Sequence, residues 1–511
     1  MVNDIKNMKD VKGHEVVYSN VIDSKVSSAT KWSLLTEIFA RLATPIANMI
    51  LARLLIPEAF GMVATITMVL SFAEIFIDAG FQKYIIQHEF SNKVEFENAV
   101  QVAFWSNVGL ALLISILIFI FRESIAYIVG NEELGIPIAV AGLTILFNAI
   151  SSVHIGVFKR EFEFKKLFWI RLAVSLVPIF ITVPAAYILR SFWALIIGNI
   201  VKSIVQATII IPSSKVGIRA FYSIKIFKEM FSFSFWTLVE SVSIWLTSNI
   251  DIFIIGRILD NHYLGLYKTT ITTISTYVGI IAAAITTVLF STLSRYQNDK
   301  EKFLDTYFRF QRKLGIILIP LGIGIFVFRD LVTIVLLGNQ WMEISLFLGL
   351  YAVLNVYAVE ICYFASEVFR SKGQPQVSFI YQIVFISILS PVIYIFAKKS
   401  FYAVCIARCA CYIPLILIAL LFCQVLYGID IINVIKNILP QTLSALIMGT
   451  TGLILMSWSD RILFQVLYIV VCIVLYFFVL LRYKSMRVEV METFGFSKIF
   501  GRLRRKADTR R

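Results

Sequence analysis

Apolar runs of about twenty residues, separated by short polar and charged connections, fill the chain from residue 31 to residue 483. A helix needs roughly 20 apolar residues to cross the ~30 Å hydrocarbon layer of a membrane. The pattern therefore predicts an all-α integral membrane protein with about fourteen transmembrane helices. The predicted segments are 32–54, 60–86, 100–121, 136–157, 168–189, 192–212, 232–256, 263–291, 314–337, 344–368, 378–397, 402–427, 439–458 and 462–482.

Two parts of the sequence resemble each other at a constant offset of 204 residues. The matching stretches are Ile50 to Leu55 with Phe60-Gly61, and Ile254 to Leu259 with Leu264-Gly265. Six spans therefore appear twice. Because six is an even number, we expect the copies to have the same orientation and to be related by an axis along the membrane normal. An accidental match between apolar segments is the alternative.

The repeat predicts two six-helix lobes followed by two extra C-terminal helices. The expected parts are a cytoplasmic N-terminal tail (1–30), an N-lobe (31–213), a cytoplasmic inter-lobe loop (214–230), a C-lobe (231–430), helices 13 and 14 (431–483) and a basic cytoplasmic tail (484–511). Paired lobes of this kind suit a transporter whose substrate path lies between them.

Charge fixes the predicted orientation. Charged residues make up 15% of the chain, against roughly 25% in soluble domains, and the net charge is +15. About 35 of the 47 Lys and Arg fall on one side when both termini share it. Cytoplasmic loops of membrane proteins are rich in Lys and Arg, so we expect both termini in the cytoplasm and no nucleic-acid partner. The polar first thirty residues predict a soluble tail before a retained first span, and no signal peptide.

Charged side chains inside predicted spans mark candidate functional residues, since each costs roughly 2.5–3.5 kcal/mol to insert. In several spans they share one helix face with Ser, Thr or Asn. We expect these faces to line a translocation cavity, although neutral packing pairs are the alternative. The candidate cavity residues are Glu37, Arg41, Asn48, Glu74, Asp78, Glu240, Asp251, Glu360, Glu367 and Arg408. Arg53 and Arg257 occupy matched helix ends, where an anchoring role explains them at least as well as substrate contact.

No catalytic constellation is visible in the sequence. It has no Walker A loop, and its four histidines show no metal-ligand spacing. All six cysteines lie in apolar segments, which indicates packing rather than a disulfide framework. We therefore expect a protein that is not an enzyme and has neither metal nor cofactor.

Several motifs resemble a known family. They are Ala40-Arg41-Leu42, Asp78-Ala79-Gly80-Phe81, the run Leu51 to Gly61 (Leu-Ala-Arg-Leu-Leu-Ile-Pro-Glu-Ala-Phe-Gly) and the run Phe158 to Phe164 (Phe-Lys-Arg-Glu-Phe-Glu-Phe). They are similar to the polysaccharide transporter (Wzx-type flippase) branch of the multidrug/oligosaccharidyl-lipid/polysaccharide (MOP) exporter superfamily. The resemblance covers the whole chain in length, number of spans and layout.

The resemblance implies a flippase in a bacterial cell membrane. Its substrate would be an undecaprenyl-diphosphate-linked oligosaccharide, such as an O-antigen, capsule, exopolysaccharide or teichuronic-acid precursor. The mechanism implied is alternating access, with H⁺ or Na⁺ as the coupling ion if there is one. Membrane lipids, a polysaccharide polymerase and a chain-length regulator are the partners it suggests.

Three other functions remain open. A multidrug cation exporter of the same superfamily usually has twelve spans and an acidic or aromatic cavity, so the extra helix pair and the arginines inside spans argue against it. A lipid II flippase has a similar fold, but the Arg-Leu-Leu-x-Pro-Glu pattern favours the polysaccharide branch. A membrane enzyme or assembly scaffold is the third alternative, and the genes that lie beside this one would discriminate among them.

Overall fold

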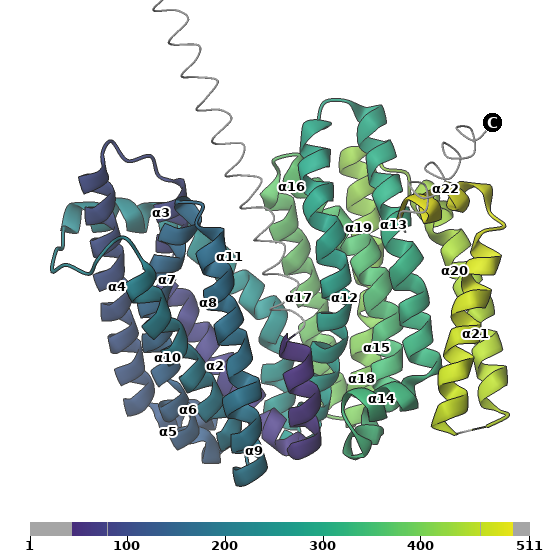
Figure 1. Ribbon diagram of the computed structural model, residues 1–511, viewed down its shortest axis with the longest axis horizontal. Helices are drawn as coiled ribbons and strands as arrows, with labels where there is room; N and C mark the ends of the chain where they lie inside the picture. Colours follow the sequence, from purple (N-terminus) through teal and green to yellow (C-terminus); the bar gives the residue numbers. More distant parts are fainter. Residues whose placement is uncertain (1–42, 79, 460, 494–511) are drawn as a thin grey trace, which may run out of the picture. The chain divides into compact units, whose positions relative to one another are not determined.

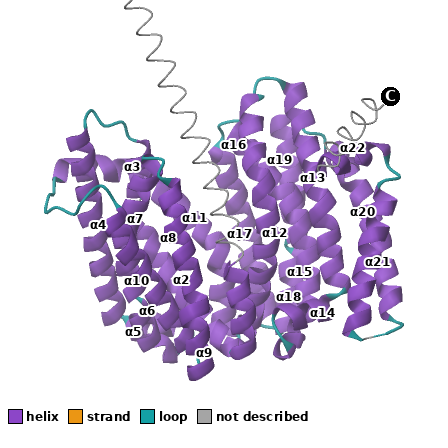
Figure 2. Ribbon diagram, viewed as in Figure 1, coloured by secondary structure: helices purple, strands orange, loops and turns teal. Residues whose placement is uncertain are grey.

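A computed structural model describes residues 43–78, 80–459 and 461–493. The regular structure in these ranges is helical, and none of the described residues forms a strand (Figure 2). Contacts divide the chain into two units. The first unit contains the described residues up to Leu55 together with Met62–Trp245, and the second contains Ile56–Gly61 and the chain from Leu246 onward. The lobe boundaries expected from the sequence stay a prediction.

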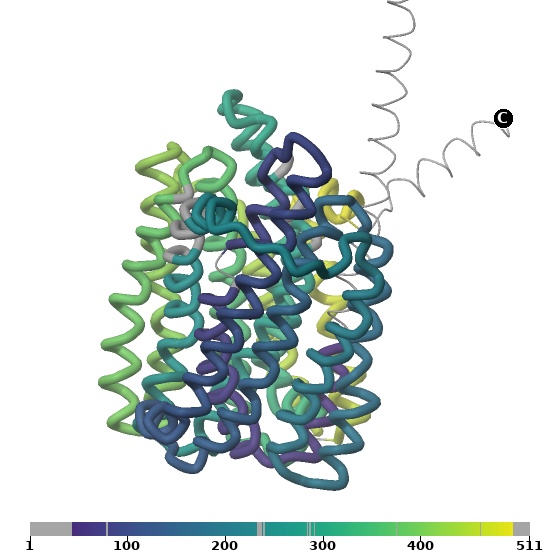
Figure 3. Tube along the Cα trace, turned by 90° about the vertical axis from the view of Figure 1, so that its left-hand side faces the viewer, coloured from purple at the N-terminus to yellow at the C-terminus, as the bar shows by residue number. Residues whose placement is uncertain are grey.

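The helices of the first unit lie side by side along one common direction (Figures 1 and 3). They are a helix over 43–54, most of α2 (Pro57–Asp78), α3 (Phe81–Gln87), α4 (Lys93–Ile120), α5 (Arg122–Ile128), α6 (Gly135–Ala141), α7 (Leu143–Arg160), α8 (Phe164–Val177), the π-turn η2 (Pro178–Thr182), α9 (Val183–Leu189), α10 (Trp193–Ser213) and the first part of α11 (Ile224–Ile258).

The second unit begins with the first turn of α2 and the last part of α11. Its remaining helices are α12 (Asn261–Arg295), α13 (Lys300–Val327), α14 (Arg329–Leu336), the 3-10 turn η3 (Asn339–Ile344), α15 (Ser345–Ala358), the π-turn η4 (Val359–Tyr363), α16 (Phe364–Ser371), α17 (Pro375–Ala397), α18 (Phe401–Ala410), α19 (Tyr412–Tyr427), α20 (Ile431–Met456), α21 (Ile462–Leu480) and α22 (Lys484–Thr493).

The predicted all-α membrane architecture is confirmed. Within the described ranges, twelve helices are long and apolar enough to cross a membrane. A thirteenth is counted if Asn261–Ala283 and Val288–Arg295, which meet at 41°, form one bent span. In order, these helices match the second to the fourteenth predicted segments. Most of the first segment, 32–54, lies outside the described residues, so the total of fourteen stays a prediction.

Several helices begin earlier than the apolar pattern predicted. The predicted segment 314–337 is preceded by helix from Lys300, where the Asp299 carboxylate accepts a hydrogen bond from the Lys302 N–H at 3.1 Å. Likewise α20 begins at Ile431, well before the predicted residue 439. The apolar pattern records only the part of a helix that lies in hydrocarbon. Charged turns can extend beyond it at no insertion cost, so the pattern does not reveal them.

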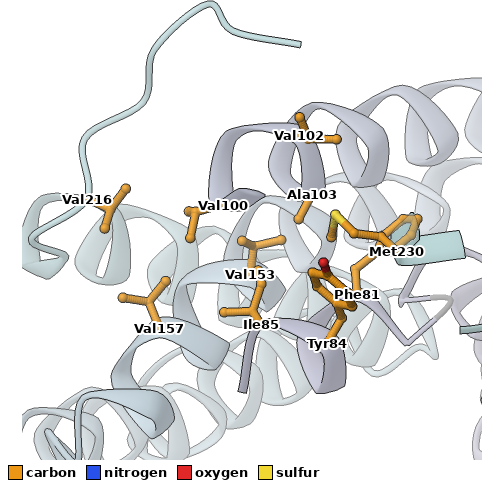
Figure 4. Close-up of a cluster of buried hydrophobic side chains, with 10 residues drawn as sticks. All are labelled: Phe81, Tyr84, Ile85, Val100, Val102, Ala103, Val153, Val157, Val216 and Met230. Atoms are coloured by element: carbon orange, nitrogen blue, oxygen red, sulfur yellow. The ribbon is translucent and has the colours of Figure 1, made fainter. Parts of the chain in front are cut away.

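An apolar core in the first unit joins α3, α4 and α7 (Figure 4). Val216 and Met230 belong to the same cluster, so the predicted inter-lobe loop packs against the helices. Polar contacts fix it further, because the Gln101 amide donates to the Gly217 carbonyl at 2.7 Å and the Trp105 indole donates to the Arg219 carbonyl at 2.9 Å. The segment between α10 and α11 is therefore a strap on α4.

The basic motif after α7 has a structural role. The Arg160 guanidinium donates to the carbonyls of Ile85 and His88 at 2.8 and 2.6 Å, and it lies over the Phe90 ring at 4.7 Å. Arg160 thus binds carbonyls left unpaired at the end of α3. In this way the motif ties α7 to α3.

The acidic residues of the same motif are paired with lysines. Lys166 and Lys215 lie 2.6 and 2.5 Å from the Glu163 carboxylate. Burial alone would raise the pKa of the Glu163 carboxyl, but hydrogen bonds from the two lysines outweigh burial and lower this pKa. The pair with Lys215 attaches the start of the strap to the turn between α7 and α8.

Candidate functional site

The sequence repeat corresponds to a close helix contact in the second unit. The first turns of α2 and α12 meet at Gly61 and Gly265. A Cβ added to Gly61 would lie 1.9 Å from the Asn261 carbonyl oxygen, and one added to Gly265 would lie 1.9 Å from the Pro57 carbonyl oxygen. The two contacts are symmetric, because Gly265 is the repeat counterpart of Gly61 and Asn261 is the counterpart of Pro57. Only glycine permits this approach of the two backbones.

A histidine with two carboxylates holds the same contact. His262 Nδ1 lies 2.8 Å from Glu58 Oε1, across the repeat offset of 204 residues, and His262 Nε2 lies 3.1 Å from Glu343 Oε2. The Tyr402 hydroxyl donates to Glu343 Oε1 at 3.4 Å. With a carboxylate at each ring nitrogen, His262 is best satisfied as an imidazolium that donates twice. The cluster joins α2, α12, η3 and α18.

The first unit contains a polar cavity of about 410 Å³. Thr67, Ser71 and Glu74, which share one face of α2, lie along its wall. The Asn148 amide on α7 donates to the Glu74 carboxylate at 2.7 Å. On α10 the polar lining residues are Asn199, Lys202 and Gln206. One carboxylate, one ammonium and several amides give this cavity a balanced charge and many hydrogen-bonding groups.

The second unit contains a cavity of about 540 Å³ with a different charge. Lys268 and Arg408 line it together with a single carboxylate, Asp251. Two cations against one anion leave the cavity wall with a net positive charge. Hydroxyl and amide groups complete the polar wall, among them those of Thr247, Thr272, Ser275, Thr276 and Asn355.

Arg408 on α18 is the central group of this second cavity. Its side chain is buried, with Nε 3.6 Å from Asp251 Oδ2 and the guanidinium over the Tyr412 ring at 4.8 Å. The Tyr267 hydroxyl donates to the same oxygen, Asp251 Oδ2, at 2.7 Å. Arg408 Nε and Nη1 are buried and have no hydrogen-bond partner. A buried donor without an acceptor costs roughly 1–3 kcal/mol, so an anion that entered would gain strong hydrogen bonds here.

Tyrosines and an asparagine fix the wall beside Arg408. The Tyr412 hydroxyl donates to the Tyr351 hydroxyl at 2.9 Å, and the Asn355 amide donates to the Tyr412 hydroxyl at 3.0 Å. The Asn355 carbonyl oxygen is buried without a partner. These hydrogen bonds hold the Tyr412 ring under the Arg408 guanidinium. They leave the Asn355 side-chain oxygen as an acceptor for a ligand hydroxyl.

The structure brings three of the predicted cavity residues to cavity walls. Glu74 lines the first-unit cavity, and Asp251 with Arg408 lines the second-unit cavity. Asn48 is exposed on the helix over 43–54. Glu37 and Arg41 lie outside the described residues.

The other predicted residues are placed elsewhere or not described. The side chains of Asp78 and Glu240 fall outside the described part of the chain. Glu360 is fully buried and lines neither cavity, and Glu367 forms an ion pair with Arg370 three residues on. Arg53 and Arg257 are exposed at their helix ends, so their anchoring role stays a prediction.

Sequence reasoning missed several residues of the two cavities. Lys202 and Lys268 belong to the walls, and their signal was the same as for the chosen residues, an ammonium inside an apolar helix. Asn148 and Tyr267 carry no such signal. Uncharged polar groups are common in apolar helices, and only their contacts with Glu74 and Asp251 distinguish them.

Curated relatives are named for polysaccharide biosynthesis. The chain is 26% identical over 307 residues to the succinoglycan biosynthesis transport protein ExoT of Rhizobium meliloti, covering 60% of this chain and 61% of ExoT. It is 23% identical over 347 residues to the lipopolysaccharide biosynthesis protein WzxC of Escherichia coli, covering 65% of this chain and 67% of WzxC. The chain thus spans less than two thirds of the length of ExoT.

Solved structures share the fold. A lipid II flippase MurJ in an inward closed conformation superposes with a TM-score of 0.74 at 16% identity, covering 90% of this chain and all of MurJ. An inward-facing multidrug resistance MATE family transporter of the MOP superfamily gives a TM-score of 0.57 at 14% identity, covering 77% of this chain and 96% of the transporter. At these identities the likeness concerns the fold alone.

A family model described as "Polysaccharide biosynthesis protein" matches residues 50–346, which is more than half of the chain. This match shows that the chain belongs to the polysaccharide biosynthesis protein family.

Proposed function

We propose that this protein translocates an undecaprenyl-diphosphate-linked oligosaccharide across the bacterial cell membrane by alternating access, and that it is a transporter without catalytic activity. The family identifies it as a polysaccharide biosynthesis protein, and its long apolar helices are those of a multi-pass membrane protein. The names of ExoT and WzxC support a cell-surface glycan as the cargo. The excess of Lys and Arg on one side supports cytoplasmic termini and the inner, cytoplasmic membrane.

The positively charged cavity of the second unit carries the proposal. A diphosphate presents several acceptor oxygens, and a guanidinium can bind two of them in parallel. Arg408 has buried donors without partners, and Lys268 adds a second cation to the same wall. Sugar hydroxyls would find donors and acceptors in the Ser, Thr and Asn side chains around them. The lipid tail would stay in the hydrocarbon while the head group passes.

The partners of this function follow from its product. A translocated oligosaccharide on the outer leaflet is the substrate of a polysaccharide polymerase, and a chain-length regulator would act on that polymerase. Membrane lipids surround the transporter throughout.

Two related functions are less well supported by the cavities. A multidrug cation exporter would need a wall that attracts cations, whereas the Arg408 cavity has a net positive charge. A lipid II flippase shares the fold and also carries a diphosphate, so the identity of the accumulated lipid decides between the two substrates.

Deletion of the gene and complementation with Arg408 variants test the proposal. Without the gene, we expect an oligosaccharide linked to undecaprenyl diphosphate to accumulate on the inner leaflet. Arg408→Gln removes charge-assisted hydrogen bonds worth about 1.5–3 kcal/mol, so it should lower surface glycan about tenfold or more at equal protein level. Lys436→Gln, at an exposed lysine on α20, is the matched control and should restore surface glycan fully.

Two results would contradict the proposal. One is accumulation of lipid II, or of no lipid-linked sugar, in the deletion strain. The other is full restoration of surface glycan by Arg408→Gln, because that would leave the second-unit cavity without a role in transport.

A further inference from the structure

Glu360 is a buried carboxyl that the two cavities do not use. It lies in the π-turn η4, between α15 and α16. Its side chain is fully buried, and neither carboxyl oxygen has a hydrogen-bond partner. Within the described chain, no lysine, arginine or histidine forms an ion pair with it.

The groups around Glu360 come from several helices and are uncharged. A Cβ added to Gly315 on α13 would lie 3.3 Å from Glu360 Oε1 and 3.7 Å from the Gln441 amide of α20. Two neighbouring phenols are engaged elsewhere, because Tyr476 donates to the Ile316 carbonyl and Tyr357 donates to Thr442. The titratable groups that face this turn are Tyr307, Tyr357, Cys362, Cys423 and Tyr476.

Burial among uncharged groups determines the protonation state. An ionised carboxylate buried without a cation or a donor costs several kcal/mol, so Glu360 holds a proton in this conformation. A metal cation would need several oxygen ligands, and the described residues contain no group of three or more His, Cys, Asp or Glu side chains that could hold one. A single carboxyl of this kind binds and releases a proton without any further ligand.

The backbone at Glu360 is also exceptional. π-turns are rare and are frequently found at functional sites. The other π-turn of the described chain, η2, begins with Pro178, whose missing N–H disrupts regular helix. No proline lies in η4. A π-turn contains one residue more than a turn of α-helix. Conversion of η4 to regular α-helix would therefore rotate Glu360 relative to α13 and α20.

We propose that Glu360 is a proton-binding site whose loading accompanies the conformational cycle. The carboxyl is protonated when η4 is packed against α13, and it releases its proton to water when the turn opens. The link to transport rests on the proposed function, whereas proton binding itself does not. The site lies where α20 and α21, the extra helix pair, meet the rest of the second unit, which gives this pair a role in proton binding.

Infrared spectroscopy of the purified full-length protein tests proton binding directly. The wild type at pH 8 should show the carbonyl band of a protonated carboxyl, and Glu360→Gln should remove it. Glu367→Gln, at the carboxylate paired with Arg370 on the same helix, should leave that band in place. Glu360→Asp keeps a carboxyl and should shift the band, which provides a second variant if Glu360→Gln folds poorly. Persistence of the full band in Glu360→Gln would overturn the proposal.

A transport assay tests the link to the cycle. In reconstituted vesicles that carry lipid-linked oligosaccharide, coupling of one proton per cycle lets one pH unit of gradient shift the leaflet ratio of the lipid by up to about tenfold. Glu360→Gln should abolish this shift while it retains exchange without a gradient. An unchanged shift in Glu360→Gln would overturn the link. If the vesicles show no flipping at all, the proposed function fails, and the infrared result still decides on the proton site.

Discussion

The ion pair between Asp251 and Arg408 illustrates how single residues shape this membrane protein. Each charge would be expensive alone in an apolar helix bundle, and each reduces the cost of the other. Asp251 also accepts a hydrogen bond from the Tyr267 hydroxyl. The negative charge of Asp251 is therefore shared between Tyr267 and Arg408. The remaining guanidinium donors are held in place for an acceptor that the protein itself does not supply.

We expect Asp251→Asn to destabilise the purified protein by about 3–5 kcal/mol, because it leaves a buried arginine without its anion. The double variant Asp251→Asn with Arg408→Gln should recover much of this loss, since it contains neither unpaired charge. Chemical unfolding of both variants in detergent measures the difference. Simple addition of the two single effects would contradict a direct interaction between these residues.

For single residues, the sequence indicated charges but not their partners. Asp251, Arg408 and Glu74 were visible because carboxylates and guanidinium groups are rare in apolar spans. Their contacts with Tyr267 and Asn148 depend on which helices pack together. A single sequence does not contain this information. For the same reason, the sequence did not predict that the Glu360 carboxyl has no hydrogen-bond partner.

Among the helices, α2 and α12 make a close backbone contact at matched positions of the sequence repeat. Gly61 and Gly265 let the two first turns touch backbone to backbone, and His262 with its two carboxylates secures them. In the sequence the aligned Gly residues were evidence for a repeat. Their structural reason is that each copy contacts its counterpart.

We expect Gly265→Ala to force the first turns of α2 and α12 apart, because its Cβ would lie 1.9 Å from the Pro57 carbonyl oxygen. The change should lower the melting temperature and reduce export. Gly279→Ala on the same helix is the matched control, since a Cβ there meets nothing within 4 Å. Equal melting temperatures and equal export for the two variants would show that the close contact contributes neither to stability nor to export.

Helix positions were predictable from the sequence, but helix ends and irregular turns were not. Hydrocarbon thickness sets the apolar length of every span, which made the spans from Pro57 onward easy to find. Polar helical turns such as Lys300 to Lys313 extend a helix beyond its apolar segment. The hydrophobic pattern of the sequence does not reveal such turns. The π-turn η4 also lacks a marker such as proline, so only the structure shows it.

For the whole molecule, the two units divide the polar groups by kind. The first-unit cavity is rich in amides with balanced charge, and the second-unit cavity has an excess of cations. Amides and hydroxyls suit sugars, whereas cations suit phosphates. The sequence predicted polar stripes in both halves, but it did not separate their charge, because Lys202 and Lys268 were not among the chosen residues.

The leaflet distribution of a defined lipid in reconstituted vesicles measures lipid translocation by this protein itself. Vesicles would contain the purified protein and an undecaprenyl-diphosphate-linked oligosaccharide from the source organism, with an external enzyme that modifies only the lipid on the outer leaflet. We predict that the wild type makes nearly the whole lipid pool accessible, whereas vesicles without protein expose only the outer half. Equal accessibility with and without the protein would show that it does not translocate this lipid.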